Sequence, residues 1–404
     1  MTTKSMKLWK VLSIAVVAIG VSVLASQWVF LWRLYTFGDH DSLTIGVDWY
    51  QPKEKVAGRP NDLPWAKDSE FVISDEVIEQ VLNYAEAQNS SAVMVLHRGT
   101  IQVEKYFQGD DRESLFNPHS MSKTVGALML GIALEEGYIP SVDSAIAPWV
   151  PEWESDPRGK ITLRDLLYMV SGLERLPPSN PAYILRKSTR QRFGTDFDGH
   201  TLDLQQSDPP GTKFEYNNDV NKLLGLVIER ATGQRYAEYL SKNLWQPLEL
   251  GDAAMYVDRP GGSVMKSCCI FSRPIDWLKV GELMRTEGRY EGRQIIPASW
   301  ISDMVKPSPL YAGYGYQIWV GNRRIESERP IDAPKNYPWQ SEPYAAEDLY
   351  FFSGHGYQRV WVVPSYELVI MRAGKDWPSA WDESYIPNII IRDLQNQEVS
   401  ATGI

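Results

Sequence analysis

The sequence contains little cysteine and little histidine. Only two cysteines occur in 404 residues, and they are neighbours, Cys268 and Cys269. Adjacent cysteines rarely form a disulfide because the closed ring is strained, so we expect two small buried residues without a bridge. The five histidines show no paired spacing such as H-x-x-x-H, which disfavours metal catalysis. We therefore expect neither a metal nor a cofactor.

Basic residues are too few and too scattered for a nucleic-acid-binding protein. The chain has 51 acidic and 41 basic residues, and no stretch interleaves aromatic residues with lysine or arginine. Hydrophobic residues make up 43% of the sequence, which is enough for a large core in one domain or in two closely packed lobes. A folded body that does not bind nucleic acid is expected.

One long apolar run lies near the start of the chain. Three lysines (Lys4, Lys7 and Lys10) precede the apolar residues 11–31, and about 20 such residues suffice to cross a bilayer. Basic residues stay on the cytoplasmic side, which would send the rest of the chain outward. We predict a cytoplasmic N-terminus at 1–10 and a single-pass inner-membrane anchor at 11–32, with a periplasmic or extracellular body. A cleaved signal and a buried helix are the alternatives.

Residues 33–70 form a polar segment that contains prolines and lacks hydrophobic periodicity. Such a composition is typical of a connector, which would either space the body from the membrane or wrap over the body. The remaining residues, 71–404, are predicted to form one large domain.

The most informative segment is Ser-Met-Ser-Lys at 120–123, at the head of an apolar run. Ser120 and Lys123 are one helical turn apart, so both side chains can face one point. A serine hydroxyl needs a nearby base, and a buried lysine with a lowered pKa can remove its proton. Residues 124–137 predict a helix whose dipole favours a developing oxyanion. A solvated serine and lysine at a helix start are the alternative.

A second segment, 211–218, precedes an amphipathic helix predicted at 221–232. Tyr216 and Asn218 would therefore lie on the turn before that helix. A phenol beside a lysine can accept the Ser120 proton and later protonate the leaving group. Asn218 can hold the lysine or a substrate carbonyl through its amide. The alternative for Tyr216 is a half-buried aromatic with its hydroxyl in solvent.

A third segment, Ser-Gly-His-Gly-Tyr-Gln at 353–358, precedes two β-rich runs, 359–363 and 367–372, that predict an antiparallel hairpin. Glycines before the first strand let the backbone approach a ligand closely, so an amide there can be an oxyanion-hole donor. Glycines that serve only a tight turn are the alternative.

In this order the three segments resemble the serine β-lactamase and penicillin-binding-protein superfamily. The branch with the greatest likeness is the class C and esterase-like one, which includes 6-aminohexanoate-oligomer hydrolase. The resemblance covers about 91–394, with 91–107 as the opening hairpin of the fold. It implies an α/β, β-lactamase/transpeptidase-like architecture: an antiparallel sheet flanked by helices, with an inserted, mostly helical lobe.

The resemblance also implies roles for the motif residues. Ser120 would be the acylated nucleophile, Lys123 its activator and Tyr216 the general base and acid. Asn218 would be a positioning residue, and the amides of Ser120 and Gln358 would form the oxyanion hole.

Within the third segment, the candidate site residues are His355, Gly356, Tyr357 and Gln358. Two of these residues depart from the family pattern. His355 takes the place of the K-T-G lysine, which binds a substrate carboxylate in β-lactamases, and histidine is a weaker, pH-dependent cation. Tyr357 stands where many relatives have a second glycine, and it would narrow the pocket.

These departures disfavour turnover of β-lactams, and the presence of all of Ser120, Lys123, Tyr216 and Asn218 disfavours a catalytically silent protein. We predict a membrane-anchored, outward-facing serine hydrolase that cleaves small amides or esters through an acyl-enzyme. The alternatives are a β-lactamase or D,D-peptidase, and a catalytically silent receptor or scaffold.

Two variable segments are expected to select the substrate. Residues 176–210 form a turn-rich insertion of the kind that often covers a site. Residues 330–350 carry Tyr337, Trp339 and Tyr344, which would form an aromatic wall for an acyl group or else pack on their own lobe. His119, just before the nucleophile, is expected to be a packing or polar neighbour.

Overall fold

The computed structural model describes residues 3–402 except for 39, 323–324, 326–336 and 338. The described helices are α1 (Thr3–Ser26), α2 (Trp28–Phe37), α3 (Asp75–Ala87), α4 (Ser122–Glu135), α5 (Leu163–Leu167), α6 (Lys187–Phe193), α7 (Phe197–Leu202), α8 (Asn218–Thr232), α9 (Tyr236–Leu240), α10 (Pro274–Arg285), α11 (Ala298–Met304) and α12 (Tyr385–Thr402). The described strands are β1 (Lys53–Val56), β2 (Ser90–His97), β3 (Thr100–Tyr106), β4 (Ala253–Tyr256), β5 (Ile270–Phe271), β6 (Arg289–Tyr290), β7 (Arg293–Gln294), β8 (Trp319–Val320), β9 (Tyr350–Gly354), β10 (Gln358–Val363) and β11 (Leu368–Gly374).

A six-stranded antiparallel sheet in the order β3-β2-β11-β10-β9-β8 forms the centre of the first lobe, the sheet lobe. The two hairpins predicted from the sequence are confirmed: β2 pairs with β3, and β10 pairs with β11 in the register Arg359↔Arg372. The first and last parts of the domain therefore meet in one sheet, because β2 lies beside β11.

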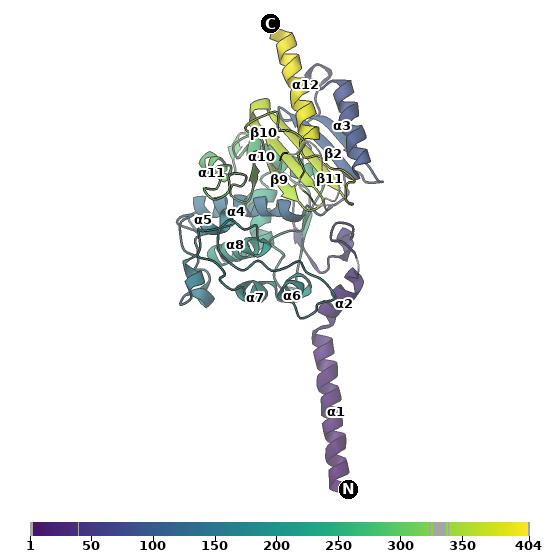
Figure 1. The fold of residues 1–404 in the computed structure, drawn as a ribbon, viewed down its shortest axis with the longest axis vertical. Coiled ribbons are helices and arrows are strands. Elements are labelled where there is room, and N and C mark those ends of the chain that lie inside the picture. The colour runs from purple at the N-terminus through teal and green to yellow at the C-terminus, as the bar shows by residue number, and fades with distance from the viewer. Residues whose placement is uncertain (1–2, 39, 323–324, 326–336, 338, 403–404) are drawn as a thin grey trace.

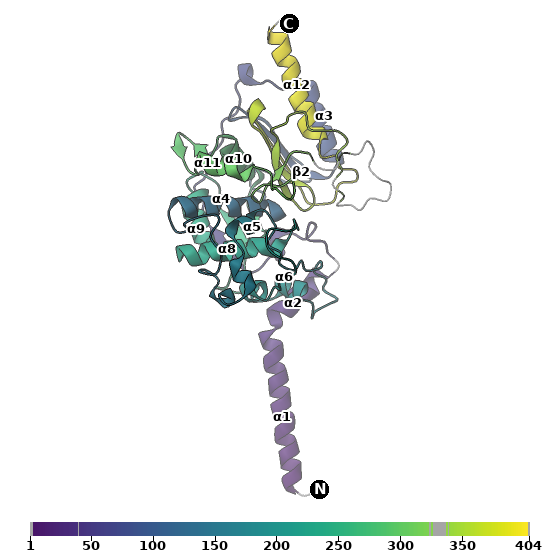
Figure 2. The ribbon, with the colours of Figure 1, turned by 60° about the vertical axis from the view of Figure 1, so that its left-hand side comes forward.

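Alternate residues of the central strands enter two separate cores. In β2, Ala92, Met94 and Leu96 pack with the core that contains α4 and α10, whereas Val93 and Val95 pack with α3 and α12. Figure 2 shows α3 and α12 on one side of the sheet and α10 and α11 on the other. The sheet thus lies between two helical layers, as predicted.

Helices α4 to α9 form a second lobe, the helical lobe, inserted between β3 and α10 (Figure 1). The predicted helices that follow the first two motifs are α4 and α8, and α8 ends at Gly233, which has a left-handed φ of 67°. Helix α4 is buried on nearly all sides because its small residues allow close approach. A Cβ on Gly131 would lie only 2.2 Å from Trp300 Cδ1. The predicted fold class is confirmed.

The N-terminal segment differs from the prediction of one continuous span at 11–32. Gln27 separates α1 from α2, and α1 projects away from the body (Figure 1). Within the residues that the structure describes, no helix is both long and apolar enough to cross a membrane. The apolar run continues into α2, where Phe30, Arg33, Leu34 and Phe37 are buried in the body. The domain boundary at residue 32 stays a prediction.

Helix α2 packs on the helical lobe through apolar and polar contacts. Phe30 and Phe37 are buried in a cluster with Phe193, and the rings of Phe37 and Phe193 lie 5.1 Å apart. The fully buried Arg33 guanidinium donates hydrogen bonds to the carbonyls of Gly194, at 2.8 Å, and Val257, at 2.9 Å. A buried arginine held by backbone carbonyls fixes the orientation of α2.

The polar segment after α2 wraps over the body, which is one of the two alternatives that the sequence left open. Strand β1 pairs with β4, and the buried Tyr50 ring lies 5.3 Å from Tyr256 and 4.9 Å from Phe271. These contacts bring the segment to the edge of the cavity described next.

Candidate active site

A short 3-10 turn, His119–Met121, presents Ser120 at the entrance to α4. Lys123 Nζ donates a hydrogen bond to Ser120 Oγ at 2.7 Å and a second one to the carbonyl of Ser267 at 3.0 Å. The one-turn spacing therefore brings the hydroxyl and the amine into direct contact, and Ser267 holds the amine from another segment.

The Lys123 side chain lies in a dry environment, with only 1% of its surface exposed. Burial lowers the pKa of Lys123 below the usual value for lysine, and the neighbouring Tyr216 opposes part of this decrease. The Lys123 amine lies 5.2 Å from the centre of the Tyr216 ring. A buried amine with a lowered pKa is a better proton acceptor near neutral pH than an exposed lysine.

Tyr216 and Asn218 lie at the start of α8, and both line the same cavity as Ser120. The Tyr216 ring stacks on Trp319 at 5.7 Å, which fixes its orientation. Between them, Asn217 is buried: its side-chain oxygen accepts a hydrogen bond from Asp219 N at 3.0 Å, and its amide donates to the Glu174 carbonyl at 3.0 Å. Sequence reasoning missed Asn217, although an asparagine before a helix is a cap signal.

The third segment approaches Ser120 through β9. A Cβ on Gly354, the last residue of β9, would lie 2.2 Å from the Pro118 carbonyl oxygen, so only glycine permits this approach. His355, Gly356 and Tyr357 follow on the turn after β9 and line the cavity.

Gln358 lies behind this turn, as the first residue of β10. It is fully buried, and its side chain donates to the Gly374 carbonyl at 2.6 Å and accepts from Gly374 N at 2.9 Å. The structure therefore brings three of the four residues of the third motif to the cavity and places Gln358 in the sheet.

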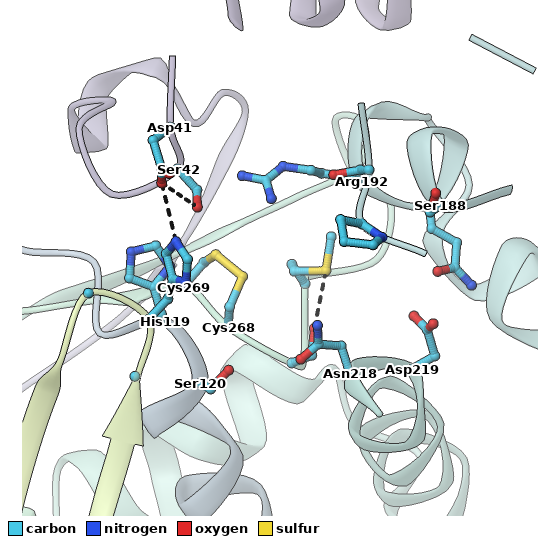
Figure 3. A pocket seen from close by; sticks show the side chains of 18 of the residues that line it. Asp41, Ser42, His119, Ser120, Ser188, Arg192, Asn218, Asp219, Cys268 and Cys269 are labelled. Atoms are coloured by element: carbon cyan, nitrogen blue, oxygen red, sulfur yellow. Dashed lines mark hydrogen bonds and ion pairs between the residues drawn. A yellow bond between two sulfur atoms is a disulfide. The ribbon is translucent and has the colours of Figure 1, made fainter. Parts of the chain in front are cut away.

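The cavity has a volume of about 690 Å³ and is shown in Figure 3. Its walls come from both lobes and from the N-terminal segment, which contributes Phe37, His40, Asp41, Ser42, Trp49 and Tyr50. Within the described part of the chain, no three histidine, cysteine, aspartate or glutamate residues are grouped so that they could hold a metal ion.

Asp41 and Trp377 are cavity residues that the sequence did not reveal. His355 Nε2 lies 3.2 Å from Asp41 Oδ1, and Trp377 Nε1 donates to Asp41 Oδ2 at 3.2 Å. The hydrogen bond with His355 lowers the pKa of Asp41 well below its usual range. No local signal could have identified this pair because its members are 314 residues apart in the chain.

His119 packs against His355, with the ring centres 5.4 Å apart and the rings edge to face. It is buried, and its Nε2 atom has no hydrogen-bond partner among the residues that the structure describes. Burial lowers the pKa of His119 well below the usual value for histidine, and the nearby His355 and Arg192 lower it further. His119 is thus a neutral packing residue, as expected from the sequence.

Cys268 and Cys269 form a disulfide, so the prediction of an unbridged pair is wrong. Cys269 has a left-handed φ of 71°, a conformation that the prediction from ring strain did not consider. Both residues line the cavity.

The predicted aromatic wall is not part of the described cavity lining. Tyr344 is buried in the core beneath α12, and the Tyr337 carbonyl accepts a hydrogen bond from Tyr357 at 2.7 Å. Residues 330–336 and 338 of that segment lie outside the described residues. Trp319 and Trp377 supply indole rings to the cavity instead. The predicted insertion at 176–210 does contribute to the lining, through Leu176, Pro177, Pro178, Ser179, Ser188, Gln191 and Arg192.

A serine and a buried lysine at the head of α4, between an antiparallel sheet lobe and a helical lobe, define a serine hydrolase fold of the β-lactamase and penicillin-binding-protein type. Residues 78–389 match the family described as Beta-lactamase, and the chain belongs to this family.

The chain is also similar to curated proteins, at low sequence identity. The chain is 25% identical over 229 residues to 6-aminohexanoate-dimer hydrolase of Paenarthrobacter ureafaciens. The aligned residues cover 54% of this chain and 57% of that protein. The chain spans less than half of three other curated relatives that it matches.

Solved structures show the fold alone, because their identities are low. A penicillin-binding-protein homologue from Caulobacter crescentus superposes with a TM-score of 0.59 at 15% identity, covering 80% of this chain and 98% of that one. EstCE1, a hydrolase with promiscuous acyltransferase activity, gives a TM-score of 0.57 at 16% identity and covers 79% and 96%.

Proposed function

We propose that the protein is a serine hydrolase that cleaves small amides or esters through an acyl-enzyme on Ser120. The observation that carries this proposal is the contact at 2.7 Å between Ser120 Oγ and the buried amine of Lys123. Burial disfavours the charged form of Lys123, and the contact places the amine where it can accept the Ser120 proton.

The proposed reaction has two steps. Neutral Lys123 takes the Ser120 proton as Oγ attacks the substrate carbonyl, and Tyr216, over which the amine lies, carries the proton to the leaving group. Water then attacks the acyl-enzyme by the reverse path, which frees Ser120.

The oxyanion would be held by two backbone amides. Ser120 N lies at the start of a helical turn, where amides have no intrahelical partner. For the second donor the sequence predicted Gln358. We now favour the amide of His355, because it directly follows Gly354 at the end of β9, the strand that approaches the Ser120 turn.

Three observations support a small amide or ester as substrate. The cavity of about 690 Å³ fits a small molecule, one relative is named for a linear amide, and one structural neighbour for acyl transfer. His355 is already engaged by Asp41, which makes it a weaker partner for the carboxylate of a β-lactam or a peptidoglycan stem. β-Lactamase and D,D-peptidase activities are therefore placed second.

We propose that the body faces an oxidising compartment outside the cytoplasm. Its disulfide supports this location, because disulfides persist mainly in such compartments. We also propose that α1 attaches the body to the membrane. This second part rests on the sequence of α1, whose Ile14, Val17 and Val21 are exposed. Cell fractionation with protease protection tests both parts.

Intact-mass spectrometry after exposure to a fluorophosphonate tests the activity. Wild-type protein should gain one adduct and Ser120→Ala none. An adduct justifies a screen with p-nitrophenyl esters, 6-aminohexanoate amides and nitrocefin. No adduct on folded wild-type protein would contradict the proposal and favour a silent receptor.

A further inference from the structure

Residues 267–270, which are distant in sequence from α4, form hydrogen bonds with its N-terminal turn. At one end, the Ser267 carbonyl accepts the hydrogen bond from Lys123 Nζ at 3.0 Å. At the other end, Ile270 N donates to Ser122 Oγ at 3.4 Å. The Cys268–Cys269 disulfide lies between these two contacts. A covalent bond that can be broken by reduction therefore sits in the middle of the segment that positions the lysine.

The backbone of this segment has an unusual conformation at the disulfide. Cys269 has a φ of 71°, in the left-handed region, which costs a residue with a side chain about 1 kcal/mol or more. The ring formed by the two adjacent cysteines covalently restricts this peptide. Without the ring, the segment is free to relax toward an ordinary conformation, and the Ser267 carbonyl moves with it.

The disulfide is accessible from the cavity. Cys268 is half-buried and lines the same cavity as Ser120, while Cys269 is 2% exposed (Figure 3). A small thiolate that enters the cavity can therefore reach the sulfur of Cys268, which is the geometric requirement for thiol–disulfide exchange.

We propose that the Cys268–Cys269 disulfide is a redox-modification site that controls the activation of Ser120, with a small dithiol as its reductant. A thiolate of the dithiol attacks Cys268 Sγ, and the S–S bond breaks with its electron pair on Cys269 Sγ. The second thiol of the reductant then displaces Cys268. Two electrons and two protons pass to the protein, which becomes a dithiol, and the reductant becomes a disulfide. This inference rests on the proposed function.

The oxidised protein is the active form. Reduction removes the restraint on Ser267, and Lys123 then loses one of the two hydrogen-bond acceptors that fix its amine. We expect the acylation rate to fall by about tenfold, the effect of losing one hydrogen bond that positions the base.

The experiment uses the full chain and graded dithiothreitol under native conditions. After removal of the reductant, one portion is alkylated with iodoacetamide and weighed, and a second is assayed for the rate of fluorophosphonate labelling. The labelling rate should fall in proportion to the fraction of protein that gains two alkyl groups, and it should recover after reoxidation. Labelling that stays constant while both cysteines become alkylated would overturn the proposal.

Further controls distinguish a failure of the redox proposal from a failure of the proposed hydrolase function. A Cys268→Ala/Cys269→Ala variant should label slowly at every dithiothreitol concentration, and Cys268→Ser serves if the double variant does not fold. Two alkyl groups on denatured protein that was never reduced would show that no disulfide exists and would also overturn the proposal. Absence of labelling in the oxidised wild type contradicts the proposed function itself, and with it the coupling.

Discussion

Two walls of the cavity are built on different physical principles (Figure 3). The catalytic wall, named after its proposed function, consists of Ser120 and Tyr216, which line the cavity, and of Lys123, whose amine contacts Ser120 Oγ. These residues come from two short motifs at helix starts. The N-terminal wall consists of Asp41, His119, His355 and Trp377, which come from segments far apart in the chain. The first wall depends on a buried amine next to a hydroxyl. The second depends on a partly exposed hydrogen-bonded pair of Asp41 and His355 beside the buried ring of His119.

This difference predicts different consequences for function. Changes in the catalytic wall should act on the rate of acylation, because they alter groups that touch the reacting atoms. Changes in the N-terminal wall should act on substrate binding and on stability, because its ion pair joins the N-terminal segment to the turn after β9. The predictions below test this division, beginning with the largest expected effect.

Replacement of Lys123 by methionine should lower kcat/KM by about 10³-fold, because general-base assistance contributes about that much. Methionine keeps most of the side-chain volume in the buried site, so the protein should still fold. The measurement is the rate of acylation by a p-nitrophenyl ester. Lys187→Met is the matched control, because Lys187 lies on the surface and pairs with Glu174. A Lys123→Met rate within tenfold of wild type would remove lysine from the mechanism.

The pH dependence of acylation should report the same amine. Burial lowers the pKa of Lys123, so the neutral base becomes available at a lower pH than for an exposed lysine. The value of kcat/KM should rise about tenfold per pH unit below that pKa and level off above it. His355→Gln should keep this inflection at the same pH. Loss of the inflection in that variant would assign the titration to the N-terminal wall.

The contact between Ser120 and Lys123 could be predicted from the sequence because their spacing is local. One helical turn separates Ser120 from Lys123, and Tyr216 directly precedes a helix whose start is readable. The same holds for the two hairpins of the sheet, where alternation and turn residues lie within a few positions of each other.

The N-terminal wall could not be predicted, because no pattern joins residue 41 to residue 355. The long apolar run at 11–31 does not by itself separate the residues of α1 from Phe30, which enters the core of the body. The disulfide could not be predicted from ring strain alone, because the sequence does not reveal that Cys269 has a left-handed φ. Each failure concerns a contact that only the folded chain creates.

Asp41→Asn should raise KM several-fold and change kcat by less than about twofold. The substitution weakens the pair with His355, at 3.2 Å, and so loosens the turn after β9 that lines the cavity. Steady-state kinetics with an ester substrate separate the two constants. Asp48→Asn, at an exposed aspartate of the same segment that does not line the cavity, is the control and should leave both constants unchanged. A fall in kcat alone would move Asp41 into the catalytic wall.

The same variant should lose about 0.5 kcal/mol of stability at neutral pH, the range typical of a partly exposed ion pair. The sign follows from the carboxylate: its pKa is lowered in the folded state by the hydrogen bond with His355, so the stabilisation is present above the unfolded pKa of about 3.9 and disappears as the pH falls below it. Urea unfolding at pH 7 and pH 3 should therefore show a smaller difference between wild type and Asp41→Asn at the lower pH.

The last prediction concerns the buried histidine of the N-terminal wall. His119 is buried and neutral in the folded protein, whereas the unfolded chain binds a proton below about pH 6.5. Because the unfolded state then binds more protons, stability should fall as the pH decreases through 6.5, by at most about 1.4 kcal/mol per unit. His119→Asn should have a smaller slope, because only the contributions of His97 and His200, whose pKa values burial also lowers, then remain. Asparagine tolerates the left-handed φ of 49° at this position. His40→Asn, at an exposed residue, should keep the slope. The measurement is urea unfolding of wild type and His119→Asn between pH 7.5 and 5.5. Equal slopes would show that His119 accepts a proton without unfolding of the protein. The rings of His119 and His355 would then form one titrating site connected to solvent.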